Sequence, residues 1–159
     1  MKKFNLQNII LFILLFLEFF LLTISNFKNS MTFDEIVYPP AGLSYLEKGD
    51  FRLNLEHPPL SKYLMALPLF ISGYKNDYET QAWQKGDQIR FGARFYFNNG
   101  NLIALNISRF STIFITLSLS ILLYLFVLKN FGKTEALLSL FFFVFYPDNI
   151  AQGSLATTD

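Results

Sequence analysis

The chain has 159 residues, 52% of which are hydrophobic, and a formal net charge of +1. This near-neutral charge argues against a nucleic-acid-binding protein, which needs a basic surface. The absence of cysteine excludes disulfide cross-links. The apolar residues are gathered into long blocks, and this pattern predicts an all-α integral membrane protein with about three transmembrane helices.

The first block, residues 6–25, contains a single ionisable residue, Glu18. Its length matches the ~20 residues that a helix needs to cross the hydrocarbon core. Lys2 and Lys3 precede it, which would also suit a cleaved signal peptide. The block is longer than a typical signal core and no small-residue cleavage site follows, so a membrane anchor is favoured. A carboxylate within a span usually faces protein or water, and we expect a structural role for Glu18.

Two further spans are predicted after a long polar interval. Residues 109–128 carry no charge beyond Arg109 at their start. The apolar run at residues 136–146 is too short to cross by itself. The third span, 135–152, therefore reaches the required length only if its helix continues past Pro147. Membrane helices tolerate such a proline where their neighbours satisfy the freed backbone groups.

The short loops predict the orientation, because cytoplasmic loops carry an excess of Lys and Arg. Lys129 and Lys133 lie between the second and third spans, and three crossings place them on the same side as Lys2 and Lys3. We therefore predict a multi-pass protein with a cytoplasmic N-terminus, located in the plasma (inner) membrane if the source is bacterial. The loop of residues 28–108 is then extracytoplasmic.

The loop has the punctuation of a folded segment. Thr32 and Glu35 match the capping box that opens a helix. Pro39 and Pro40 are expected to interrupt this helix, with Pro40 opening the next one. Gly49 is typical of a helix end.

Two later segments of the loop, residues 58–72 and 87–97, are predicted to form helices that lie in the membrane interface. In the first segment Lys62 is the only charged residue. In the second, Arg90 and Arg94 could contact lipid phosphates or simply extend their charged ends into water. The first segment carries apolar residues at helical spacing on one face: Leu60, Tyr63, Leu64, Leu67 and Ile71.

Particular motifs give the chain a family resemblance. The sequence FDEIVY at residues 33–38 precedes EHPPL at residues 56–60 and Lys62. Together they resemble the first outer loop of GT-C membrane glycosyltransferases, similar to dolichyl-phosphate-mannose–protein mannosyltransferases and aminoarabinose lipid A transferases. The segment 147–159 resembles the end of that family's third helix. The resemblance covers nearly the whole chain and implies the N-terminal part of a longer enzyme.

The resemblance implies a reaction and its acidic residues. Such enzymes move a sugar from a polyprenyl (dolichyl or undecaprenyl) phosphate to an extracytoplasmic hydroxyl acceptor, with inversion. A hydroxyl is a poor nucleophile until a base takes its proton. In the family this role is attributed to the first acidic residue of the Asp-Glu pair, which is Asp34 here. Glu35 and Asp159 would be supporting acidic groups. The competing interpretation is that Asp34 and Glu35 only cap a helix.

The departing lipid phosphate needs positive charge or hydrogen-bond donors. His57, Lys62 and Arg109 are the candidates, although loop packing, a solvated helix face and interfacial anchoring are their respective alternatives. Glu56 and His57 are weak candidates for a divalent metal, and no other cofactor is expected. Gln152 stands where the family often has His, which weakens a metal role there.

The expected partners are a polyprenyl-phosphate-linked sugar, membrane lipid, and an acceptor that is a protein, a lipid or a glycan. A protein O-mannosyltransferase-like activity is the leading hypothesis. The alternative is a non-catalytic short membrane subunit that binds lipid or a partner. A transporter is disfavoured because polar residues gather in the loop rather than within the spans.

Overall fold

The computed structural model describes residues 6–98 and 100–157. These residues form helices joined by turns and loops, with no strand among them, which confirms the all-helical expectation. Two helices are long and apolar enough to cross a membrane, α1 (Leu6–Lys28) and α6 (Leu102–Asn130). The chain divides into two compact units. The described parts of the first are residues 6–28 and 113–154, and those of the second are 29–98, 100–112 and 155–157.

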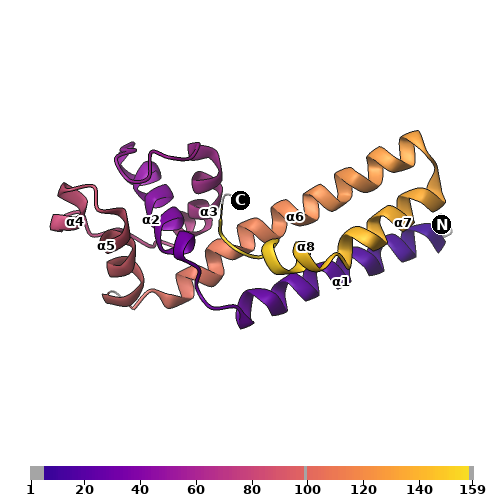
Figure 1. Cartoon of the computed structure of the whole chain (residues 1–159), viewed down its shortest axis with the longest axis horizontal. Helices are drawn as coiled ribbons and strands as arrows, with labels where there is room; N and C mark the ends of the chain where they lie inside the picture. The colour runs from indigo at the N-terminus through magenta and orange to yellow at the C-terminus, as the bar shows by residue number, and fades with distance from the viewer. Residues whose placement is uncertain (1–5, 99, 158–159) are drawn as a thin grey trace. The chain divides into compact units, whose positions relative to one another are not determined.

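The first unit combines α1 with most of α6 and with α7 (Lys133–Val144) and α8 (Pro147–Gln152). In Figure 1, α7 runs beside α1 after the sharp turn that ends α6. Gly132 makes this turn with φ of 116°, a backbone conformation that favours glycine. The helices bury one apolar cluster: Leu14, Tyr124, Val127, Ala136, Leu140 and Val144.

The third predicted span is not a single helix. α7 ends at Val144, and α8 begins at Pro147 after a break at residues 145–146. The reason is that proline lacks an N–H and clashes within a helix, whereas it is favoured at the first helical position. A third crossing at 135–152 is therefore not confirmed. Lys2 and Lys3, on which the orientation partly rests, lie outside the described residues.

The second unit holds the folded loop. Its helices are α2 (Phe33–Lys48), α3 (Pro59–Ile71), α4 (Gln81–Gln84) and α5 (Gln88–Ala93), which continues into a π-helical turn, η1 (Arg94–Asn98). α2 packs against both α3 and α5. α3 lies within the predicted segment 58–72, and α5 together with η1 occupies residues 88–98, close to the predicted segment 87–97. That these helices lie in the membrane interface stays a prediction.

α2 does not stop at its prolines, contrary to the prediction. It runs unbroken through Pro39 and Pro40 to Gly49, which ends it in the left-handed conformation as predicted (φ 64°). Proline has no N–H, so the carbonyls four residues earlier lose their helical donors. One of them, Ile36, lies directly against Gly92 of α5, where a Cβ atom would approach the Ile36 oxygen to 1.8 Å. Tertiary packing therefore keeps the helix together where local preference opposes it.

α3 buries the face opposite to its predicted apolar stripe. A helix of a soluble protein would bury the stripe itself. The face built from Lys62, Met65, Ala66 and Leu69 is buried. Most of the predicted apolar stripe stays exposed, with Leu60 at 68% and Ile71 at 75%. An exposed apolar face is the feature of a helix that contacts lipid or another apolar partner.

Candidate active site at the start of α2

The centre of the second unit is a buried ion pair between Glu35 and Arg109. Arg109 Nε donates to Glu35 Oε1 at 2.7 Å, and Nη2 donates to Oε2 at 2.8 Å. Both side chains are 0% exposed. Two parallel hydrogen bonds of this kind match the planar guanidinium to the carboxylate. The contact joins the first turn of α2 to the beginning of α6.

Further donors and acceptors complete the pair. The carboxylate of Glu35 also accepts hydrogen bonds from the backbone N–H of Thr32 at 2.9 Å and of Ala156 at 2.8 Å. Arg109 donates to the carbonyls of Asn29 at 3.0 Å and Ser30 at 2.8 Å. The pair therefore fastens four segments of backbone, those at residues 29–32, α2, α6 and the chain after α8.

The surroundings decide the protonation state of Glu35. Burial alone would raise the pKa of its carboxyl, but the hydrogen bonds from Arg109, Thr32 and Ala156 outweigh that effect and lower the pKa below its usual value of 4.5. Glu35 is thus ionised at neutral pH and its oxygens are already occupied. A carboxylate in this condition is poorly placed to take a proton from a substrate.

The carboxylate of the neighbouring residue, Asp34, is not held by other groups in this way. Its side chain is half-buried in the first turn of α2, and it makes no hydrogen bond or ion pair with any other described residue. In the Asp-Glu motif, the carboxylate of Glu35 is therefore engaged in hydrogen bonds, whereas that of Asp34 is available to a substrate. Asp159, the third predicted acid, lies outside the described residues.

Lys62 is not on a solvated face, and that alternative is wrong. Its side chain is fully buried, and Nζ donates to the carbonyls of Asn54 at 2.7 Å and His57 at 2.8 Å. The rings of Tyr38 and Tyr45 each lie 5.8 Å from Nζ. Burial lowers the pKa of Lys62, while the nearby charge of Glu56 opposes that change. Through these two hydrogen bonds the ammonium group stabilises the turn that precedes α3.

His57 is half-buried beside α2. Its ring contacts Tyr38 edge-on, with 5.7 Å between ring centroids. Tyr38 follows Asp34 by four residues, so both side chains are on the same face of α2. The structure thus brings the histidine of the EHPPL motif to the helix face that carries Asp34. The sequence alone does not predict that His57 and Asp34 lie on the same side of α2.

The other predicted residues are dispersed. Arg90 and Arg94 form partly exposed ion pairs with Asp87 and Asp77. Glu56 is exposed. Within the part of the chain that the structure describes, no three His, Asp or Glu side chains are grouped to hold a metal ion.

The sequence reasoning missed the buried hydroxyl of Tyr96 and the two polar partners of Glu18, Ser120 and Asn149. The hydroxyl of Tyr96 is buried and makes no hydrogen bond to another described residue. Burial and then the negative charge of Glu35 raise its pKa, which places it near the ion pair. In the first unit, Glu18 is 1% exposed, and its Oε1 accepts from Ser120 at 2.7 Å and Asn149 at 3.2 Å. The polar residues within the apolar helices were the only available signal for this cluster.

Fold and site together define an all-helical membrane protein whose folded loop presents an acidic motif fixed by a buried arginine. The family model for dolichyl-phosphate-mannose-protein mannosyltransferase matches residues 9–159. The chain belongs to this family, which confirms the resemblance found in its motifs, and membership indicates a mannosyltransferase-type glycosyltransferase. No curated protein and no solved structure matches the chain at a significant level.

Proposed function

We propose that this chain carries the base-bearing part of a glycosyltransferase that moves a sugar from a polyprenyl phosphate to an extracytoplasmic hydroxyl, with inversion. The proposal rests on the different surroundings of the two neighbouring carboxylates at residues 34 and 35. Asp34 is an available carboxylate, and Glu35 holds its position through Arg109. A base must be both accessible to the acceptor and held in place.

The reaction needs a single displacement. Asp34 takes the proton of the acceptor hydroxyl as the oxygen attacks the anomeric carbon of the sugar. The bond between that carbon and the phosphate oxygen breaks at the same time, and the lipid phosphate leaves with the bonding electrons. The proton stays on Asp34 until it exchanges with solvent. Attack opposite the leaving group inverts the anomeric carbon.

His57 is the best-placed donor for the leaving phosphate among the three predicted candidates. It is half-buried on the Asp34 side of α2, through its contact with Tyr38. The charge of Arg109 is already matched by Glu35, and Lys62 is engaged with backbone carbonyls. These two residues support the site from within, whereas His57 can direct a ring N–H outward.

The proposed topology puts this site at the outer membrane surface. α1 has 23 residues, which rise about 34 Å and cross the ~30 Å hydrocarbon core. Asp34 follows shortly after the end of α1 at Lys28. The exposed apolar residues of α3 in the same unit support contact with lipid there. A lipid-linked sugar presents its head group at this level.

Paired substitutions at residues 34 and 35 test the proposal. In the full-length protein, Asp34→Asn should reduce transfer from a polyprenyl-phosphate sugar at least a hundredfold without changing the melting temperature. Glu35→Gln should lower both activity and melting temperature, because it leaves Arg109 buried without a counter-charge. Normal turnover by Asp34→Asn would remove Asp34 as the base.

A further inference from the structure

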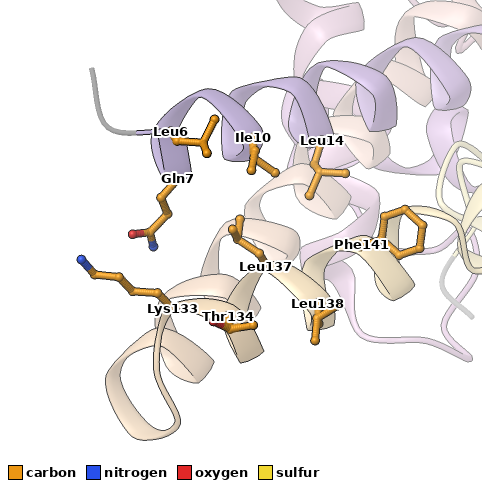
Figure 2. Close-up of a pocket in the computed structure, with 9 residues that line it drawn as sticks. All are labelled: Leu6, Gln7, Ile10, Leu14, Lys133, Thr134, Leu137, Leu138 and Phe141. Atoms are coloured by element: carbon orange, nitrogen blue, oxygen red, sulfur yellow. The ribbon is translucent and has the colours of Figure 1, made fainter. Parts of the chain in front are cut away.

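The first unit contains an apolar groove that shares no residue with the Asp-Glu motif. It lies between α1 and α7 and has a volume of about 530 Å³ (Figure 2). Its body is formed by aliphatic and aromatic side chains: Leu6, Ile10, Leu14, Leu137, Leu138 and Phe141. Leu138 and Phe141 are 52% and 45% exposed. The groove is therefore open to the surroundings at α7.

One end of the groove is polar. Gln7, Lys133 and Thr134 line it, and Figure 2 shows Lys133 extending toward the side of Gln7. Gln7 is held by a hydrogen bond to the Tyr124 hydroxyl at 2.6 Å. Lys133 is exposed and forms no ion pair with any described residue. Its ammonium is therefore a positive charge without an ion-pair partner at the end of the apolar groove.

The positive charge at this end of the groove does not come from the N-terminal dipole of α7, because an acidic side chain already complements that dipole. The carboxylate of Glu135 folds back to the first turn, where it would lie 2.9 Å from a Cβ atom added to Gly132. This carboxylate complements the helix dipole. Gln7, Lys133 and Thr134 are the polar residues that line the groove, and Lys133 is the charged one.

We propose that this groove binds an anionic phospholipid of the bilayer, with an acyl chain along α1 and α7 and the head group on Lys133. Apolar walls suit an acyl chain, and the charge of Lys133 attracts an anionic group at the end where a head group would lie. Basic pockets between membrane helices recognise anionic head groups in this way.

The bound lipid is distinct from the sugar donor. The polar end of the groove lies at the N-terminal end of α1, whereas Asp34 follows its C-terminal end. The 23 residues between these ends rise about 34 Å, which is enough to cross the ~30 Å hydrocarbon core. The lipid head group therefore lies in the leaflet away from the one that the α1 C-terminus reaches. Lipid binding there is independent of the transfer reaction.

Native mass spectrometry on the full chain tests the proposal. The protein is released from nanodiscs that contain equal amounts of phosphatidylglycerol and phosphatidylcholine, and the retained lipids are counted. The wild type should retain phosphatidylglycerol with about a fivefold preference, the size of effect expected of one lysine near a membrane surface. Lys133→Ala should abolish this preference. Lys129→Ala is the matched control, since Lys129 is an exposed lysine in the last turn of α6 that does not line the groove, and it should keep the preference.

A second pair of variants tests the apolar body. Leu138→Trp should fill the groove and reduce retention of both lipids, whereas Leu122→Trp on the exposed face of α6 should not. Equal retention of the two lipids by the wild type would overturn the proposal, as would equal effects of Lys133→Ala and Lys129→Ala. A photo-crosslinking amino acid at position 138 that attaches to protein instead of lipid would also overturn it. None of these measurements depends on sugar transfer.

Discussion

Glu35 and Arg109 are 74 residues apart in the chain, yet their side chains form two parallel hydrogen bonds in a site closed to solvent. A buried ion pair is weak evidence for stability, because desolvation offsets much of the attraction. Its value here is positional. It fixes the first turn of α2, and Asp34 is part of that turn.

The geometry of Arg109 is expected to matter as much as its charge. Arg109→Lys keeps the positive charge but loses the two-pronged contact and the bonds to the carbonyls of Asn29 and Ser30. We expect a clear drop in melting temperature in detergent, because the lost hydrogen bonds leave buried acceptors unpaired. The loss of folding free energy should stay below the ~3–5 kcal/mol typical when a buried charge loses its partner altogether. Arg90→Lys, in a largely exposed pair with Asp87, is the control and should change little. Equal effects of the two variants would contradict a special role for the buried geometry.

The stability supplied by Glu35 should depend on pH. The pKa of Glu35 is lowered in the folded protein, so the folded state binds its proton less readily than the unfolded chain. The resulting stabilisation is present above the unfolded value of about 4.5 and is lost as pH falls through the lower folded value. The difference in melting temperature between the wild type and Glu35→Gln should therefore narrow below pH 4.5. A difference that stays constant from pH 7 to pH 3.5 would contradict this assignment.

The local signals were reliable where short-range chemistry decides the outcome. The Thr32 and Glu35 pair does open α2, Gly49 does end it, and the apolar block after residue 5 is one long helix. Each of these depends on residues within a few positions of one another. Pro147 also follows a local rule, since it begins a new helix, although the prediction required the helix to continue.

Long-range packing accounts for what the sequence did not reveal. Pro39 and Pro40 oppose a helix, but contact with α5 at Gly92 keeps α2 continuous. The spacing of apolar residues on α3 identified a stripe and not the side on which it faces protein, so the burial of Lys62 was unexpected. The partner of Glu35 could not be deduced either, because many basic residues were available and only the fold brings Arg109 to it.

The close approach of α2 and α3 gives a further prediction. A Cβ atom on Gly42 would come within 2.0 Å of the Lys62 carbonyl oxygen, whereas one on Gly49 would meet nothing within 4 Å. Gly49→Ala should cost only about 1 kcal/mol, the usual penalty for the left-handed conformation. Gly42→Ala should cost more, because the two backbones must separate. Thermal melting of both variants checks the order, and a milder effect of Gly42→Ala would contradict the packing of these helices.

Two roles of Lys62, holding the turn before α3 and binding the lipid phosphate, can be separated by experiment. If the ammonium mainly holds the turn before α3, Lys62→Met should speed hydrogen exchange at residues 54–57 and lower the melting temperature, since it removes both bonds to the carbonyls of Asn54 and His57. Activity should then fall through the displaced His57, with both kcat and KM affected. Lys75→Met, at an exposed lysine of the same unit, is the control for loss of charge. A rise in donor KM alone, with unchanged exchange at residues 54–57, would instead assign Lys62 to the lipid phosphate.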